Sequence, residues 1–327
     1  MSVYTTVTRE ALVIFLDDYD LGNLIDFTGI AAGMENTNYF VNTTKGRYVL
    51  TLYEQYTHDD LPFFLGLMAH LSQHHVKTIK PVANKNKQFL GTLCEKPAVL
   101  IERLSGASLK QSEVSIEHCR LIGDALARFH LAALSYPQQR HHQRDIDLSP
   151  KFTQPLIATL EGEDKALLQQ ELEFSKTINW QSLPSGITHS DLFCDNAMFD
   201  MVDGKLVLSG IIDLYFACND AFIYDLAVVA NDWCSNEDSS LDKARVSALL
   251  VAYNKVRELE ENEKQAWLAM LRICYLRFWV LRLDLHVNPR GGELVLRKDP
   301  NELKLKLQYC LLNKDSIIIN TDMLCTH

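Results

Sequence analysis

Several patterns are missing from this sequence of 327 residues, and each absence excludes a class of protein. Its eight cysteines form no CxxC pair and no spacing typical of zinc ligands, which favours free, reduced thiols. The N-terminus lacks the basic start, apolar run and cleavage site of a signal peptide. The longest stretch without a charged residue, 61–76, contains a proline and three histidines, unlike a membrane span. We therefore expect a cytoplasmic protein without a membrane segment.

Positive charge is also scarce. The chain has 32 Lys and Arg against 42 Asp and Glu, a formal net charge of −10. Such a surface repels phosphate backbones at long range, which excludes nucleic acid as the expected partner. An anionic ligand would need local cations, either a metal ion or a few placed basic side chains. Apolar residues at 47% and charged residues at 23% are typical of a folded globular chain.

The first hundred residues predict a small sheet with one helix. Residues rich in β-formers and separated by polar turns predict an antiparallel sheet connected by hairpins. The helix is predicted over 61–76. The predicted strands are 24–30, 38–43, 47–54, 80–82, 84–88 and 98–102. Small residues and a glycine at 103–107 mark a break, so we predict one lobe over residues 1–103 and a second over 104–327.

The second lobe is predicted to be mostly helical. Apolar residues recur at helical spacing over 116–134, 160–176 and 241–312. The polar run 138–147 predicts a solvated loop, and its paired histidines lack the matched ligands of a metal site. One non-helical island remains, at 187–226, and it holds most of the chemically suggestive residues. The predicted fold class is α+β.

Within that island, His189, Asp191 and Asn196 form a His-x-Asp-x-x-x-x-Asn pattern, and Asp213 follows an apolar strand. Phosphoryl transfer needs a carboxylate to position or deprotonate the acceptor hydroxyl, and carboxylate and carboxamide oxygens to hold Mg²⁺. The strand before Asp213 can pair back alongside residues 197–199. A structural alternative for Asp225, set against a role in the site, is the N-cap of a helix over 226–229. The ordered set indicates a kinase with Mg²⁺ and a nucleotide.

These residues resemble the aminoglycoside phosphotransferase and choline kinase superfamily over essentially the whole chain. The resemblance implies a protein-kinase-like fold, with a small antiparallel-sheet lobe that binds the nucleotide and a larger helical lobe that binds the acceptor. It implies that Asp191, with His189 beside it, is catalytic, and that Asn196 and Asp213 hold Mg²⁺. ATP is the implied phosphoryl donor.

Longer strings in both lobes are similar to bacterial homoserine kinases of this fold. They are residues 33–41, 48–54, 61–64, 215–220, 231–234 and 276–279. The resemblance implies phosphorylation of L-homoserine on the route to threonine. Its carboxylate and ammonium groups need an arginine and an acid. The candidates for these contacts are Arg277, Arg282, Asp220 and Asp232.

The nucleotide is expected on the first lobe. The polar loop 33–38 could cover the ATP phosphates through its backbone and through Asn36, Thr37 and Asn38. Glu102 at the lobe junction would meet the adenine through backbone groups. Kinases of this fold usually carry a phosphate-binding lysine on the third strand, but Thr51 stands there.

Two alternatives remain open. A kinase for choline, methylthioribose or an aminoglycoside would keep Asp191, Asn196 and Asp213 and change the acceptor residues. A catalytically dead relative that only binds a nucleotide or a partner would explain Thr51, but it has no chemical need for the three retained residues. The sequence gives neither the oligomeric state nor the choice between ATP and GTP.

Overall fold

Alternation of side chains shapes the N-terminal sheet. Buried and partly exposed residues alternate from Asn36 to Thr43 without a break, the period of a strand with one face in a core. The next strand pairs antiparallel with it, placing Tyr39 opposite Leu50 and Val41 opposite Tyr48. All four side chains belong to one apolar core.

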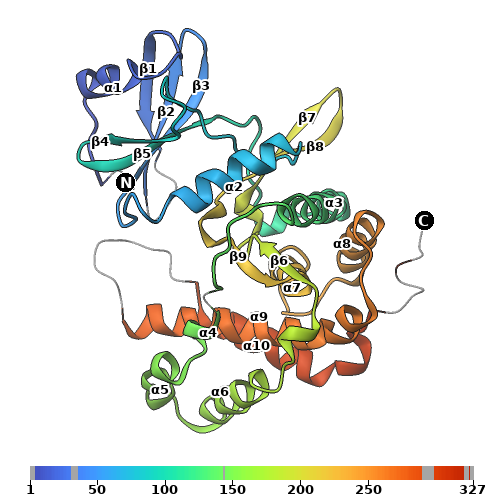
Figure 1. Cartoon of the computed structure of the whole chain (residues 1–327). Helices are drawn as coiled ribbons and strands as arrows, with labels where there is room; N and C mark the ends of the chain where they lie inside the picture. The colour runs from blue at the N-terminus through green and yellow to red at the C-terminus, as the bar shows by residue number, and fades with distance from the viewer. Residues whose placement is uncertain (1–3, 31–35, 143, 289–297, 320–323, 325–327) are drawn as a thin grey trace. The chain divides into compact units, whose positions relative to one another are not determined.

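The computed structural model describes residues 4–30, 36–142, 144–288, 298–319 and 324 (Figure 1). The chain divides into two compact units. Unit 1 comprises residues 1–107 and 198–215, and unit 2 comprises 108–197 and 216–327.

Unit 1 is an antiparallel sheet with two helices and a separate hairpin. Its elements are α1 (Arg9–Leu16), β1 (Leu24–Gly29), β2 (Asn36–Thr43), β3 (Gly46–Tyr53), α2 (Pro62–Gln73), β4 (Leu90–Leu93), β5 (Lys96–Glu102), β7 (Ala197–Val202), β8 (Lys205–Ile211) and most of η4 (Leu214–Phe216). The sheet order is β1-β2-β3-β5-β4, and every pairing is antiparallel. The predicted antiparallel sheet is thus confirmed.

One predicted strand region is wrong. Residues 84–88 form a turn, in which the Asn84 side chain accepts hydrogen bonds from the backbone N–H groups of Asn86 and Gln88. Residues 80–82 run beside β5 but form only a single bridge, at Pro81, whose ring nitrogen has no hydrogen to donate. The strand that completes the sheet is β4.

Helix α1 covers one face of the sheet. Its Leu12, Phe15 and Leu16 are buried against alternate residues of the strands. Figure 1 shows this helix in dark blue beside the strands. The other face carries Thr51 and Tyr53 of β3, which are also buried. The sheet therefore has two inner surfaces with different side chains, apolar toward α1 and more polar on the opposite side.

The hairpin of β7 and β8 belongs to unit 1 by its contacts. The two strands pair as predicted, and Asp203 and Gly204 make the turn with φ angles of 51° and 73°, as in a tight hairpin turn. Phe199 and Ala107 exchange backbone hydrogen bonds of 2.9 Å in both directions. The two compact units therefore have other boundaries than the two predicted lobes, in which this hairpin belongs with the helices of the second lobe.

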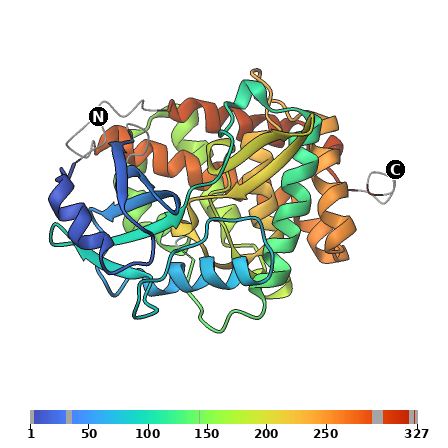
Figure 2. The ribbon, with the colours of Figure 1, turned by 90° about the horizontal axis from the view of Figure 1, so that it is seen from above.

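Unit 2 is mostly helical and surrounds one buried helix. Its elements are η1 (Gln111–Glu113), α3 (Ile116–Ala133), α4 (Arg144–Asp147), α5 (Pro150–Thr159), α6 (Gly162–Ser175), η2 (Trp180–Ser182), β6 (Ser185–Thr188), η3 (Cys194–Asn196), β9 (Cys218–Ala221), α7 (Phe222–Trp233), α8 (Lys243–Val256), α9 (Glu261–Val287), α10 (Pro300–Leu312) and η5 (Lys314–Ser316). In α7 every residue except Asp232 is buried, as expected for a mostly apolar helix at the centre of a lobe. Helices α3 and α8 lie side by side (Figure 1 and Figure 2).

The predicted solvated loop at 138–147 is wrong at its C-terminal end. Residues 144–147 form α4, and Arg144 and Asp147 are only 3% and 8% exposed. Both side chains pair with charges on distant elements, Asp220 of β9 and Arg277 of α9. Because these partners come much later in the sequence, local polarity indicated solvent where the fold provides counter-charges.

Neither a membrane segment nor a disulfide occurs among the described residues. No helix there is both long and apolar enough to cross a bilayer. The seven described cysteines are free, as predicted, and Cys325 lies outside the described residues.

Candidate active site

The loop after β6 holds the first predicted residues. Strand β6 pairs antiparallel with β9, and Thr188 at its end donates its hydroxyl to the carbonyl oxygen of Cys218 at 3.0 Å. His189 follows and is fully buried. Ser190 has a φ of 66°, a left-handed conformation that costs energy for a residue with a side chain. The chain therefore turns sharply just before Asp191.

Asp191 and Asn196 are brought together, as the sequence predicts. The Asn196 Nδ2 group donates to the Asp191 backbone oxygen at 2.8 Å and approaches its Oδ2 at 3.4 Å. The Asp191 backbone N–H points to Nδ1 of His189 at 3.3 Å. Because the amide nitrogen of Asn196 faces Asp191, its Oδ1 atom faces the other way. The two side chains thus present carboxylate and carboxamide oxygens from one short loop.

Asp225 fixes the turn of this loop. Its carboxylate accepts the backbone N–H groups of His189 and Ser190, each at 2.8 Å. Nε2 of His130 lies 2.9 Å from the same carboxylate, and the other ring nitrogen lies 2.7 Å from the Tyr253 hydroxyl. The alternative role as a helix N-cap is wrong, since the N-cap of α7 is Ala221 and Asp225 lies in the first turn.

The charge states in this network follow from burial and hydrogen bonding. Burial raises the pKa of Asp225, but the hydrogen bonds that its carboxylate accepts from His130 and from the backbone N–H of His189 outweigh that effect and leave the pKa below its ordinary value. Burial lowers the pKa of His130, only partly offset by Asp225. We therefore describe a charged Asp225 that accepts from a neutral His130, which in turn accepts from Tyr253.

Asp213 lies in unit 1, two residues after the end of β8. It has a φ of 61°, so it also adopts the left-handed conformation. Upstream, the carbonyl oxygen of Ile211 accepts the Thr78 hydroxyl at 3.0 Å and the Ile79 N–H at 3.2 Å. Downstream, the Tyr215 hydroxyl is hydrogen-bonded to that of Tyr53. The residue is thus held from both sides.

The donor atoms of Asn196 and Asp213 suit a hard cation. Magnesium prefers carboxylate and carbonyl oxygens and keeps several further oxygen ligands from water or phosphate. Among the residues that the structure describes, no three His, Cys, Asp or Glu side chains form a cluster that could hold a metal ion alone. A cation bound by the side chain of Asn196 or of Asp213 would therefore need further oxygen ligands from elsewhere.

The predicted nucleotide residues of β2 point to opposite faces of the sheet. Residues 33–35 lie outside the described residues, and 36–38 belong to a strand instead of a loop. The buried Thr37 hydroxyl donates to Glu54 at 2.6 Å and accepts the N–H groups of Tyr4 and Thr5. Asn38 lies on the other face of β2.

That other face shows what replaces the expected lysine. The hydroxyl of Thr51 donates to Oδ1 of Asn38 at 2.7 Å, so a neutral pair occupies this position. Helix α2, with the sequence PFFLGLMAHLSQ, contains no Asp or Glu. It therefore offers no carboxylate that could pair with a lysine. Glu102 ends β5 and forms an exposed ion pair with Lys80 at 2.8 Å.

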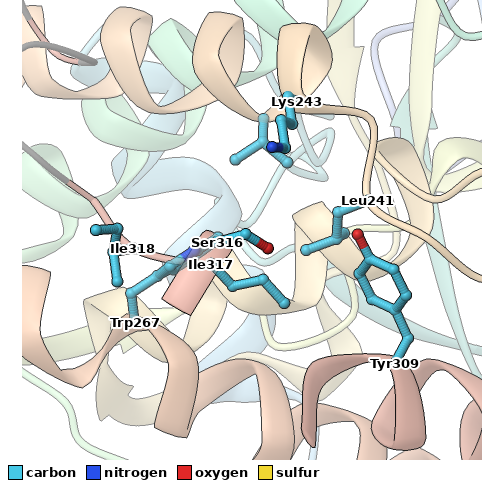
Figure 3. A pocket seen from close by; sticks show the side chains of 8 residues that line it. Leu241, Lys243, Trp267, Tyr309, Ser316, Ile317 and Ile318 are labelled. Atoms are coloured by element: carbon cyan, nitrogen blue, oxygen red, sulfur yellow. The ribbon is translucent and has the colours of Figure 1, made fainter. Parts of the chain in front are cut away.

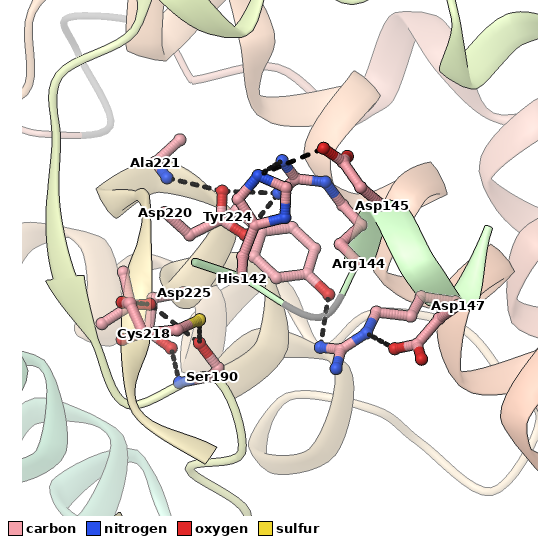
Figure 4. Close-up of polar contacts among 12 residues, drawn as sticks. His142, Arg144, Asp145, Asp147, Ser190, Cys218, Asp220, Ala221, Tyr224 and Asp225 are labelled. Carbon is pink, nitrogen blue, oxygen red and sulfur yellow. Dashed lines mark hydrogen bonds and ion pairs between the residues drawn. The ribbon is translucent and has the colours of Figure 1, made fainter. Parts of the chain in front are cut away.

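The four predicted acceptor residues lie in three places of unit 2. Asp220 and Arg277 belong to one buried cluster, in which Asp220 pairs with Arg144 and Arg277 with Asp147 at 2.8 Å (Figure 4). Arg282 pairs with Glu302 of α10 at 2.7 Å. Asp232 accepts the backbone N–H of Cys194 at 2.7 Å, next to the loop of Asn196.

Sequence reasoning missed Arg144 and Asp147 in this cluster. The Arg144 guanidinium lies 3.3 Å from the centroid of the Trp180 ring, a stacked cation–π contact. The hydroxyl of Tyr224 accepts from Arg277 at 3.3 Å. Residues 144–147 read Arg-Asp-Ile-Asp, and this local sequence contains no signal that separates a buried cluster from a solvated turn.

A pocket occurs elsewhere in unit 2, between the starts of α8 and α9 and the end of α10 (Figure 3). The residues that line it are Leu241, Lys243, Val246, Trp267, Tyr309, Ser316, Ile317 and Ile318. None of them is a predicted site residue. The chemistry of the loop after β6 therefore locates the candidate site better than the shape of this pocket.

Comparison with known proteins agrees with this chemistry. Residues 26–259 match the phosphotransferase enzyme family. The homoserine kinase of Methylobacillus flagellatus is 42% identical over 318 residues, 97% of this chain and 98% of that protein. The homoserine kinase of Nitrobacter hamburgensis is 42% identical over 313 residues, 94% of each chain.

Solved structures of other kinases share the fold. A microcompartment-associated aminopropanol kinase has a TM-score of 0.70 at 14% identity and covers 94% of this chain and 98% of its own. An amicoumacin kinase has a TM-score of 0.68 at 14% identity and covers 96% of both chains. The expected protein-kinase-like fold is thus confirmed. Since the family match spans most of the sequence and the relatives align over nearly their full length, the chain belongs to the phosphotransferase enzyme family.

Proposed function

We propose that this phosphotransferase moves the γ-phosphoryl group of ATP to the side-chain hydroxyl of L-homoserine, with Mg²⁺ as its metal ion. The similarity to homoserine kinases supports the acceptor most directly, because it extends over 97% of the chain and so includes unit 2 as well as unit 1. The Asp191–Asn196 arrangement supports the reaction type, since it joins a carboxylate and a carboxamide on one short loop.

In this proposal Asp191 orients the acceptor hydroxyl and accepts its proton. The loop is well suited to this task because its backbone is fixed from both sides, by Asn196 and by Asp225. Correct placement of the hydroxyl supplies most of the rate in phosphoryl transfer. Asn196 and Asp213 are the proposed ligands of Mg²⁺, which neutralises charge on the phosphate oxygens when bound.

We assign the nucleotide to unit 1. Asn36, Thr37 and Asn38, which begin β2, are assigned to the ATP phosphates. Glu102, which ends β5, is assigned to the adenine ring, which backbone N–H and C=O groups can meet. The neutral Thr51–Asn38 pair replaces a lysine, so the metal ion and other basic residues must neutralise more of the phosphate charge. We therefore expect a strict requirement for a divalent cation.

The experiment is a measurement of ADP release with Mg²⁺ and ATP on separate acceptors. L-Homoserine is compared with choline, methylthioribose, L-threonine, L-serine and an aminoglycoside. Turnover on homoserine alone supports the proposal, and turnover only on another acceptor overturns the substrate but keeps the kinase chemistry. Nucleotide binding without any turnover would favour a binding protein, in which the neutral pair at Thr51 is the decisive feature.

Two variants test the role of Asp191. Asp191→Asn removes the proton acceptor at constant size, and we expect a loss of kcat of at least roughly a hundredfold. Asp195→Asn is the matched control, because Asp195 is an exposed acid on the same loop. Similar activity of both variants would contradict the role of Asp191.

The acceptor residues are tested by the Michaelis constant for homoserine. We propose Arg277 or Arg282 for its carboxylate and Asp220 or Asp232 for its ammonium group. Arg277→Ala and Arg282→Ala should raise this constant in one variant and leave the constant for ATP unchanged. If the Michaelis constants for homoserine and for ATP stay at the wild-type values in Arg277→Ala and in Arg282→Ala, neither arginine binds the substrate.

A further inference from the structure

Asp213 lies in a short segment of irregular backbone. Between the end of β8 at Ile211 and the short η4 helix, the backbone follows neither a helix nor a strand, and Asp213 adopts a positive φ. Such a conformation persists only when surrounding contacts hold it. The upstream contact is the pair of hydrogen bonds to the Ile211 oxygen, and the downstream contact also contributes to how firmly Asp213 is fixed.

The downstream contact is a pair of buried hydroxyl groups. Tyr215, two residues after Asp213, is hydrogen-bonded through its hydroxyl to the hydroxyl of Tyr53 in β3. The two side chains are 8% and 1% exposed. Their ring centroids lie 5.3 Å apart, edge to face. A buried hydroxyl that loses its partner costs free energy, so each tyrosine constrains the other.

Two further rings enclose this pair. The ring centroid of Tyr56 lies 6.1 Å from the ring centroids of both Tyr53 and Tyr215. The ring centroid of Phe64 of α2 lies 5.6 Å from that of Tyr215 and 6.0 Å from that of Tyr56. We name these four residues the tyrosine cluster. It joins β3, α2 and the Asp213 segment, and all of it lies within unit 1. Apolar packing alone would be served equally well by phenylalanine, so the two hydroxyls have a more specific role.

We propose that the hydrogen bond between Tyr53 and Tyr215 positions the carboxylate of Asp213 for binding a divalent cation. This inference rests on the proposed function, in which Asp213 is a metal ligand. The aromatic contacts of the cluster hold the ring of Tyr215 in place. The hydrogen bond to Tyr53 fixes the orientation of this ring and its position relative to β3. Because only one residue separates Tyr215 from Asp213, a shift of the ring moves the carboxylate.

The test uses Tyr53→Phe, Tyr215→Phe and the double variant. These changes keep the rings and remove one or both hydroxyls. Tyr48→Phe is the matched control, since Tyr48 lies on β3 but faces the core beneath α1. The measurements are the affinity of the protein with ATP for Mn²⁺, followed by electron paramagnetic resonance, and the Mg²⁺ concentration that gives half of the maximal rate.

We expect each single variant to weaken Mn²⁺ binding roughly three- to tenfold, the range of one net hydrogen bond. The half-saturating Mg²⁺ concentration should rise by a similar factor, while ATP binding without metal stays unchanged. The double variant should lose no more than either single variant, because no hydroxyl remains without a partner. The control should match the wild type.

Asp213→Asn separates the two possible failures. If Asp213→Asn weakens Mn²⁺ binding and the phenylalanine variants only lower the unfolding midpoint, the positioning role is overturned and the proposed function stands. If Asp213→Asn binds Mn²⁺ like the wild type, Asp213 is not a metal ligand, and both the metal assignment and this inference fail. A loss of metal affinity in the phenylalanine variants without a loss of ATP affinity supports the inference.

Discussion

The two segments that carry the proposed catalytic groups are held in different ways. In unit 2 the loop of Asp191 is held by a buried carboxylate, Asp225, which accepts three donors from His189, Ser190 and His130. In unit 1 the contacts that hold the Asp213 segment include neutral groups, namely the hydroxyls of Thr78 and Tyr53 and the backbone N–H of Ile79. Hydrogen bonds to a charged acceptor are about twice as strong as neutral ones.

This difference indicates how much each segment tolerates change. A buried charge that loses its partners is strongly destabilising. A neutral hydroxyl that loses its partner costs only about 1–3 kcal/mol. We therefore expect the loop of Asp191 to respond to substitution with loss of folding, and the Asp213 segment to respond with a smaller loss of placement.

The largest expected effect is that of Asp225→Asn. All three groups around this carboxylate are donors, so the NH₂ group of asparagine must face one of them. We expect the free energy of unfolding to fall by about 3–5 kcal/mol, measured by urea denaturation. Asp124→Asn is the control, because Asp124 is an acid of α3 whose salt bridge to Arg128 is exposed, and its loss should stay below about 1 kcal/mol. If the two variants lose equal amounts of unfolding free energy, the buried carboxylate of Asp225 holds its loop no more firmly than an exposed salt bridge would.

Gly106 gives the next largest effect, on the unit 1 side of the comparison. It has a φ of +81°, and a Cβ atom there would lie 1.9 Å from the carbonyl oxygen of Phe199. Gly106→Ala should therefore break the backbone bonds between Ala107 and Phe199 that hold the β7–β8 hairpin, and lower the unfolding free energy by about 2–4 kcal/mol.

Gly204→Ala is the matched control for that substitution. Gly204 also has a positive φ, of +73°, but a Cβ atom there meets nothing within 4 Å. Only the backbone strain of about 1 kcal/mol remains. If both variants unfold at the same urea concentration, the close approach of the hairpin at Gly106 does not contribute to stability.

The pH dependence of stability tests the contact between His130 and the charged carboxylate of Asp225. Because burial lowers the pKa of His130 below its ordinary value of 6.5, its neutral form contributes stability above that pH. This stability is lost as the pH falls through the lower pKa of the folded state, since the unfolded chain takes up the proton first. We expect the wild type to lose roughly 1–2 kcal/mol more than His130→Gln between pH 7 and pH 5. Identical pH profiles from calorimetry would mean that His130 is not held neutral.

The sequence predicted the loop of Asp191 and Asn196 better than it predicted the contacts that support this loop. Spacing alone brought Asp191 and Asn196 together, because five residues across a tight loop leave few arrangements. The apolar period of α3 and the alternation of β2 are equally local signals. By contrast, Asp225 reaches His189 across 36 residues and Arg277 reaches Asp147 across 130. Such pairs depend on tertiary contacts that no local pattern contains.

The smallest expected effect concerns the neutral anchor. Thr78→Val removes the hydroxyl that donates to the Ile211 oxygen and keeps the shape of the side chain. That oxygen still accepts the N–H of Ile79 at 3.2 Å, so no buried group is left without a partner, and we expect a loss of only about 0.5–1.5 kcal/mol in urea denaturation. A loss as large as that of Asp225→Asn would show that neutral hydrogen bonds hold the Asp213 segment as firmly as charge holds the loop of Asp191.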